Sequence, residues 1–458
     1  FAYNISVFIK NMTDFYLQTF SCLALLSLSM GIYLLAKKTR IPFTVLLVAF
    51  GLVLGWIISH EPRFSFLLSF ELGPEMLFYV FLPILLFESG YNMRIKDLMA
   101  NKWSIGLLAI VSLIISALIT SAIMYVVLTY IFDIQIPFII YFLFGALISA
   151  TDPVAVLALF KECNAPKRLT LIFEGESLFN DGTALAFFLV ILGVVMEMSG
   201  YQGSHGANLL DHLFASHHGG IWIVFKGILS FLSMLLLGGL FGAIIGLLAS
   251  KFVKKIKWAP LVEITISILL AHITFLLAEG ISHFVVPLSW VIATTIAAVV
   301  FGSIGRKHLS PEIESTMHSI WDYMAFVTNA IIFLLLGIMI IKLWVHWNYL
   351  IIPVAMSIVA VMVARALSVY SVITPFNVLK MEEEIPKSWQ HLLSWWSLRG
   401  ALAIIMALLI PADLSFPGWQ FPLSVQEFIL GLTVGCVVFT LFIKALTITP
   451  LMKKLHIK

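Results

Sequence analysis

The sequence predicts an all-α integral membrane protein with about 13 transmembrane helices, and three observations support this fold class. Of the 458 residues 61% are hydrophobic and 11% are charged, whereas soluble domains have about 45–50% apolar and about 25% charged residues. The apolar residues form repeated stretches of about 20, the length that an α-helix needs to cross a bilayer. Charged residues gather between those stretches. This composition excludes a soluble globular domain.

Thirteen apolar stretches follow one another along the chain. The third is short, and the eighth and ninth can also be interpreted as one long helical hairpin. An odd number of spans puts the two termini on opposite sides of the membrane. The predicted spans lie near residues 15–36, 42–59, 74–90, 104–131, 137–160, 174–198, 220–250, 260–279, 283–303, 320–341, 348–373, 390–411 and 422–447.

The placement of lysine and arginine predicts the orientation of these spans. If the N-terminus is outside, twenty of the 27 Lys and Arg residues fall in inner segments and three in outer ones, and the others lie within spans. Because cytoplasmic loops carry the excess of lysine and arginine, we expect an external N-terminus and a cytoplasmic C-terminus. We also expect the protein in a plasma membrane rather than in an organelle. Two Asn-X-Ser/Thr patterns then lie outside, which makes Asn4 and Asn11 glycosylation candidates.

The sequence predicts no cofactor and no nucleic acid partner; membrane lipids are the expected surroundings. The three cysteines lie far apart, without metal or disulfide spacing. The outer loop 199–219 holds four histidines, which fits a zinc site or, more simply, a polar loop. The inner loop 380–387 mixes charges of both signs, as a solvated connection does.

The spans divide into two sets of six within one membrane domain, 1–458. The first repeat covers 15–198, a linking helix 220–250, and the second repeat 260–447. The first set starts outside and the second inside, so the two would form an inverted-topology repeat, which is typical of secondary transporters. Span five would then correspond to span twelve, and both should be broken where they cross. Arg399-Gly400 interrupts span twelve as expected.

An aspartate followed by a proline lies within span five, in the sequence SATDP. Pro153 removes one helical hydrogen bond and disfavours helical geometry at Asp152, so the helix should break there. Unwound backbone persists in a bilayer only where it lines a cavity or is buried in protein. Free carbonyls, the Thr151 hydroxyl and the Asp152 carboxylate would offer oxygen ligands to a hard cation such as sodium. The alternative is a proline kink with one structurally paired aspartate.

Span six, EGESLFNDGTALAFF, carries further charges. Ser177 and Asp181 are four residues apart and share a helix face, whereas Glu176 points about 140° away from Asp181. We therefore expect Asp152 and Asp181 to face an ion, and Glu176 to form a salt bridge with Arg399, whose guanidinium needs a partner in the membrane.

The other charges in or near spans have several explanations. Glu88, near the inner end of span three, would join the cavity or cap its helix. Four acidic residues lie near predicted span boundaries, namely Glu197, Glu263, Glu279 and Asp322. Three basic residues have stems long enough to reach the membrane surface as orientation anchors, namely Lys226, Arg365 and Lys444.

At these residues the chain resembles the monovalent cation/proton antiporter family, in the branch of the sodium/proton exchangers. The matching segments are LPILLFESGY, SATDPVAVLALF, EGESLFNDGTA, NAIIFLLLG, SLRGALA and FTLFIKALTITPLMKKL, in order from residue 82 to 455. The resemblance implies antiport of sodium (or lithium) and protons. It also implies a homodimer, in which a six-helix core moves like an elevator against a dimerisation domain interleaved with it in sequence.

The resemblance also assigns roles. Asp181 would be the principal carrier carboxylate. Asp152, the Thr151 backbone and Ser177 would complete the site, and Glu88 would be reached through water.

Asn180 also belongs to this predicted site. It stands where an electrogenic branch carries a second aspartate, so the resemblance implies electroneutral exchange of one sodium for one proton. Glu176 and Arg399 match the family's structural salt bridge. Asn329 replaces an acid found in many animal exchangers; together with SATDP and the sequons, this resembles sperm-type and plant salt-tolerance exchangers, which carry C-terminal regulatory regions.

Three other interpretations stay open. Polar residues in broken helices could line a cation channel, which would lack coupling between sodium and protons. Asp152 and Asp181 could serve as the acid pair of a membrane-embedded hydrolase, although no catalytic motif accompanies them. A transport-inactive regulatory homologue would keep the motifs without the activity.

Overall fold

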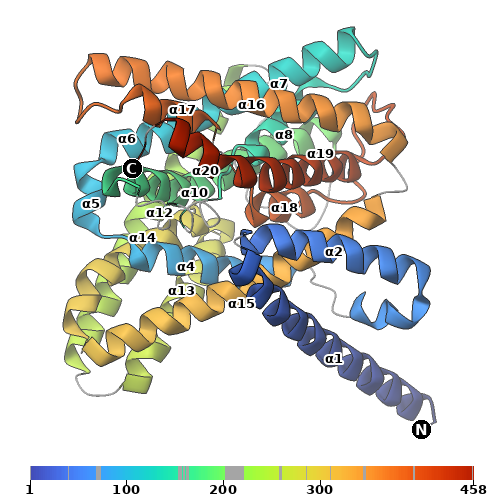
Figure 1. The fold of residues 1–458 in the computed structure, drawn as a ribbon, viewed down its shortest axis with the longest axis horizontal. Helices are drawn as coiled ribbons and strands as arrows, with labels where there is room; N and C mark the ends of the chain where they lie inside the picture. The colour runs from blue at the N-terminus through green and yellow to red at the C-terminus, as the bar shows by residue number, and fades with distance from the viewer. Residues whose placement is uncertain are drawn as a thin grey trace.

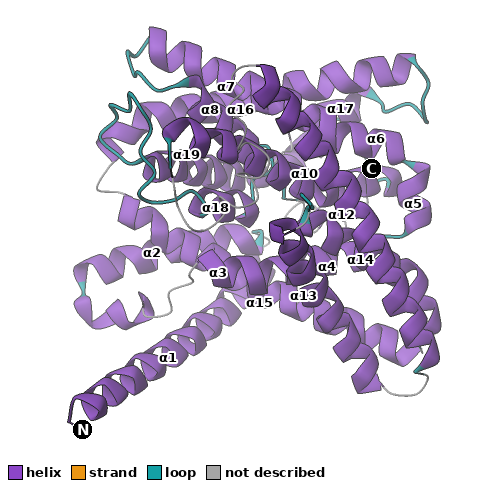
Figure 2. Ribbon diagram, turned by 180° about the vertical axis from the view of Figure 1, so that it is seen from behind, coloured by secondary structure: helices purple, strands orange, loops and turns teal. Residues whose placement is uncertain are grey.

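A computed structural model describes residues 2–39, 41–68, 74–152, 165–201, 221–256, 260–284, 286–309, 311–343, 347–395 and 398–455, with Leu157, Phe160 and Ile457. The described chain is helical almost throughout and contains no strand (Figure 2). Ten of its helices are long and apolar enough to cross a membrane. The predicted all-α multi-pass membrane fold is confirmed, whereas the total of 13 spans stays a prediction.

Several predicted spans differ in length or boundary from the observed helices. The third starts with a short helix and a π-helical turn before α4, and the fifth and twelfth are interrupted. The ninth predicted span, 283–303, starts later, because α13 continues to Phe284 and Pro287 follows before α14. The segments concerned are α3 (Pro74–Met76), the π-helical Leu77–Phe81, α4 (Leu82–Asn92), α8 (Phe138–Ile148), α13 (Pro260–Phe284), α14 (Trp290–Ile304), α17 (Lys387–Trp395) and α18 (Ala401–Leu408).

One group of helices forms what we call the scaffold bundle. α2 packs along α15, and α14 packs against α4, α12 and α13. Figure 1 shows α1, α2, α13 and α15 in the lower part of the view, with the N-terminal end of α1 projecting from it. The helices of this bundle, besides α4, α13 and α14, are α1 (Ala2–Thr39), α2 (Phe43–His60), α12 (Ile221–Lys255) and α15 (Pro311–Leu343).

Glycines bring the backbones of the scaffold bundle close together. A Cβ atom placed on Gly337 of α15 would lie 2.7 Å from the Cα atom of Gly51 on α2. One placed on Gly242 of α12 would lie 2.9 Å from the Cα atom of Ala293 on α14. Membrane helices associate through such small residues, because packing replaces the hydrophobic effect inside a bilayer. Main-chain contact therefore fixes these helices against one another.

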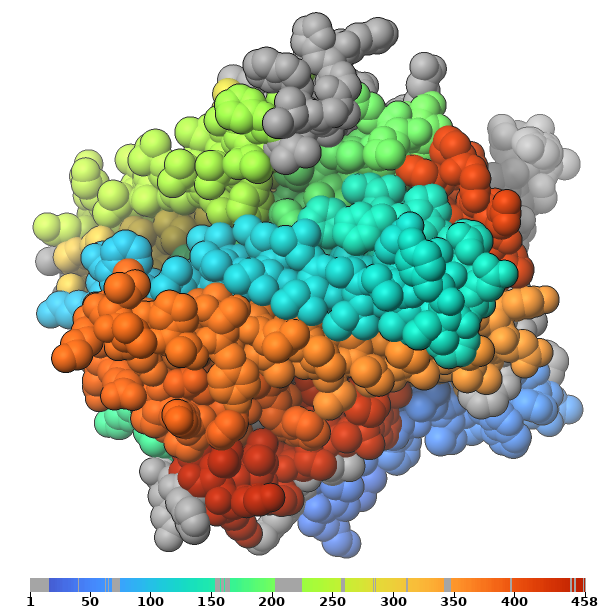
Figure 3. All heavy atoms as spheres, turned by 90° about the horizontal axis from the view of Figure 1, so that it is seen from above, coloured from blue at the N-terminus to red at the C-terminus, as the bar shows by residue number. Residues whose placement is uncertain are grey.

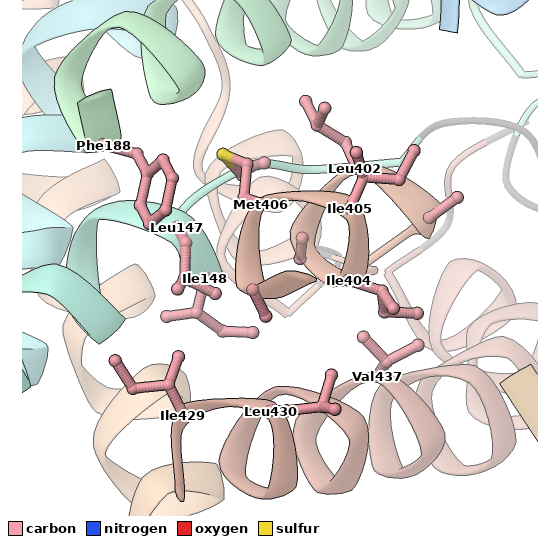
Figure 4. Close-up of a cluster of buried hydrophobic side chains, with 14 of the residues drawn as sticks. Leu147, Ile148, Phe188, Leu402, Ile404, Ile405, Met406, Ile429, Leu430 and Val437 are labelled. Atoms are coloured by element: carbon pink, nitrogen blue, oxygen red, sulfur yellow. The ribbon is translucent and has the colours of Figure 1, made fainter. Parts of the chain in front are cut away.

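A second group forms the core bundle. α8 packs against α7 and α10, and α16 packs against α7, α17 and α19. Figure 3 shows α7 and α16 side by side along one face. Figure 4 shows α18 surrounded by buried apolar side chains of α8, α10 and α19. Besides α8, α17 and α18, the bundle contains α7 (Leu113–Tyr130), α10 (Lys167–Ser199), α16 (Trp347–Val378) and α19 (Val425–Phe439). The short helices α5 (Ile95–Ala100) and α6 (Lys102–Gly106) precede α7 in the chain, and α20 (Ala445–Lys454) follows α19.

Both predicted helix interruptions are present. α8 ends at Ile148, residues 150–152 are not helical, and helical structure returns at Leu157 and Phe160. Residues 398–400 likewise separate α17 from α18. Sequence reasoning located these breaks because proline and glycine mark them directly.

Some predictions fall partly or wholly on residues outside the described ones. Pro153, within span five, and residues 202–219, which hold the four histidines of the outer loop, are among these residues. Asn4 and Asn11 lie in α1, and their glycosylation stays a prediction.

Candidate cation-binding site

A cavity of about 510 Å³ lies between the scaffold bundle and the core bundle. Its scaffold wall comes from the start of α2, from α4 and from α15, and its core wall comes from residues 150–152, from α10 and from the start of α18. No Lys, Arg or His of the described chain lines it, and a cavity lined by one sign of charge favours a ligand of the other sign. Five carboxylate residues line it, namely Glu88, Asp152, Glu174, Asp181 and Asp322.

The two interrupted helices meet at this cavity and satisfy each other's backbone groups. The Asp152 amide donates a hydrogen bond of 2.9 Å to the Leu398 carbonyl. Arg399 Nη1 donates one of 2.9 Å to the Ala150 carbonyl, and the Arg399 amide donates to Thr440 Oγ1 at 3.2 Å. An unpaired backbone group buried away from water is destabilising, so each break is stabilised by the other. The hydrogen bonds at the Asp152 amide and at the Ala150 carbonyl hold this stretch of backbone against residues 398–399.

Asp152 and Asp181 both line the cavity, and their charges lie close enough to interact. Ser177, one helical turn before Asp181 on α10, donates a hydrogen bond from Oγ to the Thr151 carbonyl. Thr151 Oγ1 is buried without a hydrogen-bond partner among the described residues. The structure therefore gathers the four predicted side chains around one place, where carboxylate, hydroxyl and carbonyl oxygens are available. Their binding of an ion stays a prediction.

Glu88 approaches the same cavity from the scaffold bundle. Its carboxylate accepts hydrogen bonds from Asn92 Nδ2 at 2.9 Å and from Ser89 Oγ at 3.3 Å. The carboxylates of Glu174 and Asp322 are also near enough to interact with Glu88 electrostatically. Of the two predicted roles, the structure supports membership of the cavity.

Asp322 is a cavity residue that sequence reasoning assigned to a span boundary. It lies 3.1 Å from His318 Nδ1 and is 53% exposed, so it sits where the cavity meets solvent. A signal was present in the sequence. Asp322, Ala325, Phe326 and Asn329 follow one another at helical spacing and all line the cavity, which marks one face of α15.

The predicted Glu176–Arg399 salt bridge is wrong, because Glu176 pairs with another arginine. Arg365 Nη2 lies 2.6 Å from Glu176 Oε1, with side-chain exposures of 4% and 3%. Arg399 uses a backbone carbonyl as its partner instead.

The predicted surface roles of Arg365 and Lys444 are also wrong. Arg365 and Lys444 are 3% and 2% exposed. Both side chains are therefore buried inside the protein, in α16 and in the π-helical segment Thr440–Lys444, rather than extended toward a membrane surface. Arg365, like Arg399, is an arginine inside an apolar span, so the sequence already indicated that its side chain needs a partner within the protein.

The profile of the transmembrane sodium/hydrogen exchanger family matches residues 24–454. The chain belongs to the sodium/hydrogen exchanger family. The family is one of transporters rather than of enzymes.

Two bacterial antiporters are similar in sequence to most of this chain, and an archaeal antiporter is similar in fold. The Na(+)/H(+) antiporter NhaG of Bacillus atrophaeus is 34% identical over 434 residues, 93% of this chain and 73% of its own length. The Na(+)/H(+) antiporter NhaH of Halobacillus aidingensis is 32% identical, covering 94% of this chain and 96% of its own. The sodium proton antiporter MjNhaP1 of Methanocaldococcus jannaschii, solved at pH 8, has a similar fold, with a TM-score of 0.75 at 18% identity over 96% of this chain and 99% of its own.

Asn180 lies apart from the other residues that were predicted to form the cation site. It is 0% exposed, and neither amide atom has a hydrogen-bond partner among the described residues. Ser177, Leu178 and Asp181 of α10 line the cavity, whereas Asn180 does not. Asn180 thus directly precedes Asp181 in α10 but does not line the cavity in this conformation.

Proposed function

We propose that the protein is a secondary active sodium/proton antiporter, in which Na⁺ (or Li⁺) and H⁺ compete for Asp181 and Asp152. One observation carries the proposal. Two carboxylates face a single cavity where two interrupted membrane helices cross. Discontinuous helices at the bilayer midplane form the substrate and ion sites of many secondary transporters, and the oxygens of Thr151 and Ser177 lie beside the carboxylates.

Competition for the same carboxylates provides the coupling. A carboxylate removed from water favours its neutral, protonated form, whereas a bound cation favours the ionised form. The site therefore releases its proton when it binds sodium and releases sodium when it is protonated. Net exchange follows if the site faces each side of the membrane in turn.

The packing of the two bundles supports alternating access by rigid-body movement of the elevator type. Within the scaffold bundle, backbones contact one another at Gly51, Gly337 and Gly242. Between the bundles, the atoms nearest to a Cβ on Gly182 of α10 would be two side-chain atoms of Ile292 and, at 3.4 Å, its amide nitrogen. A contact made through side chains, as at Gly182, yields more readily to sliding than the main-chain contacts within the scaffold bundle do.

The cavity faces the cytoplasm if the predicted orientation holds. Glu88 lies near the end of span three, Glu174 near the start of span six and Asp322 near the start of span ten, all on the side predicted to be inside. We assign this conformation to the inward-facing state. Sodium binding from the cytoplasm would then be accompanied by proton release into it, before sodium leaves on the outer side and protons return.

Asn180 supports electroneutral exchange. With a neutral amide next to Asp181, the site has one carboxylate fewer to carry a proton than a site with two adjacent aspartates. We therefore propose that the Asp152–Asp181 pair, taken together, exchanges one proton for each sodium ion. We also propose a plasma-membrane homodimer that joins through scaffold bundles, with an external N-terminus, and a role in pH regulation.

The experiment uses purified full-length chain in liposomes with a trapped pH dye. Potassium and valinomycin set the membrane voltage, sodium is added, and Asp181→Asn serves as the matched variant. Under the proposal, sodium drives a pH change that is independent of the set voltage and is lost in the variant. A voltage-dependent response would reject one-for-one exchange. Sodium entry without proton movement would identify a channel, and the absence of any sodium or proton flux would reject transport.

A further inference from the structure

We propose that Gly400 is a positioning residue that fixes the size of the cation site, because it brings the second interrupted helix into contact with Asp152. The inference rests on the proposed function and deepens it. It identifies the feature that sets discrimination among monovalent cations of different size.

The contact between Gly400 and Asp152 leaves no room for a side chain. A Cβ atom on Gly400 would overlap Asp152 Oδ2 and would lie 2.5 Å from Asp152 Cβ and 2.8 Å from Asp152 Cγ. Ordinary carbon–carbon contacts are about 3.5–4.0 Å. Gly400 has φ −116° and ψ −166°, an extended conformation that any residue adopts. The backbone geometry therefore does not require glycine here, but the space beside Asp152 does.

Rotation of the Asp152 side chain cannot relieve this contact. The Cβ atom of Asp152 is attached to the backbone, and its position does not depend on the side-chain rotamer. That backbone is held by the bonds of the Asp152 amide to Leu398 and of the Ala150 carbonyl to Arg399. Ser177 holds the Thr151 carbonyl from a third direction. Any larger residue at position 400 must therefore push the two interrupted segments apart.

A displacement of this kind changes the site itself. Restoring an ordinary contact requires a separation of about 1 Å, which moves Asp152 relative to Asp181 on α10. Selectivity between cations depends on cavity size and ligand placement, and a small cation loses more when its ligands move apart, because its contacts are the shortest. Gly400 therefore fixes where Asp152 lies relative to Asp181, and the preference among Na⁺, Li⁺ and K⁺ depends on that placement.

Gly400→Ala tests the proposal in the liposome assay, with Na⁺, Li⁺ and K⁺ offered separately. We expect the KM for Na⁺ to rise about tenfold, the KM for Li⁺ to rise more, and discrimination against K⁺ to weaken, while the maximal rate changes less. The matched control is Gly435→Ala on α19, whose added methyl would meet the side chain of Val354, away from the cavity. It should lower thermal stability without changing the order of cation preference. Equal effects of the two substitutions on cation preference would overturn the proposal.

A thermal-unfolding cycle tests the contact without any transport measurement. Gly400→Ala is combined with Asp152→Gly, which removes the Cβ atom that the new methyl would meet. The loss of Tm caused by Gly400→Ala should largely disappear in the Asp152→Gly background, even if Gly400→Ala alone is poorly folded. An equal loss in both backgrounds would overturn the contact. An inactive wild type would reject the proposed function, whereas an active wild type with unchanged cation preference in Gly400→Ala would reject only the role of Gly400.

Discussion

Arg365 Nη2 on α16 lies 2.6 Å from Glu176 Oε1 on α10, and both side chains are almost completely buried. The pair joins the helix that carries Asp181 to a neighbouring helix of the core bundle. The charges of both residues also reach Arg399, which lies at the helix crossing. Arg365, Glu176 and Arg399 therefore form one group of buried charges beside the crossing of the interrupted helices.

Removing either partner of this pair should destabilise the protein strongly. Glu176→Ala or Arg365→Ala leaves a buried charge without its partner, and we expect a loss of about 3–5 kcal/mol. The double variant should lose less than the sum of the two single variants. Thermal unfolding in detergent measures these changes. Arg399→Ala provides the comparison, and stronger coupling of Glu176 to Arg399 than to Arg365 would contradict the observed pairing.

The apparent affinity for sodium should depend on pH because protons compete for the same carboxylates. As pH rises, fewer protons occupy the site, so the KM for Na⁺ should fall until the carboxylates are fully ionised, while the maximal rate at saturating Na⁺ changes less. Dye-based exchange at a series of pH values measures this. If KM is constant and only the maximal rate changes, direct competition is not the coupling mechanism.

Glu88 and Asp322 should attract cations to the cavity without carrying them. Glu88→Gln and Asp322→Asn each remove one negative charge from a wall that has no basic residue in the described chain. We expect a several-fold rise in KM for Na⁺, a nearly unchanged maximal rate, and a smaller effect at high ionic strength, where charges are screened. Glu197→Gln, which alters an exposed carboxylate elsewhere on α10, should have no such effect. Complete loss of exchange in Glu88→Gln would instead give Glu88 a place in the carrier site.

Asn180→Asp should make exchange sensitive to voltage. A second carboxylate beside Asp181 would add a proton to each cycle, so charge would no longer balance. In liposomes clamped with potassium and valinomycin, the sodium-driven pH change should then vary with the set voltage, whereas in the wild type it should not. Active but voltage-independent Asn180→Asp would show that stoichiometry is not set at this position.

The helix interruptions could be predicted from the sequence because their causes are local. Pro153 follows Asp152, and Gly400 follows Arg399. Each of these neighbouring residues predicts an interruption of its helix without any knowledge of the tertiary structure. The shared helix face of Ser177 and Asp181 is equally local, since it depends only on helical spacing.

The partner of Glu176 could not be predicted in the same way. Helical spacing shows that Glu176 points away from Asp181, but which arginine it meets depends on how α10 and α16 pack. Both Arg365 and Arg399 lie within apolar spans, and only tertiary packing distinguishes them. The cavity position of Asp322 is hidden in the sequence for a related reason, because a residue near the end of an apolar stretch is expected near the membrane surface. In the structure α15 begins already at Pro311, so Asp322 lies within the helix, on the face that lines the cavity.

The hydrogen bonds between the two helix breaks have a consequence for how the protein is made. The Ala150 carbonyl and Arg399 Nη1 are 249 positions apart in the chain, so the first break is synthesised and inserted long before its partner exists. Until residues 398–400 reach the membrane, the backbone groups at 150–152 lack these partners in a medium that offers few others. The first half of the chain must therefore wait in an incomplete state, shielded by neighbouring helices, water or the insertion machinery. Biogenesis is complete only when the second half arrives.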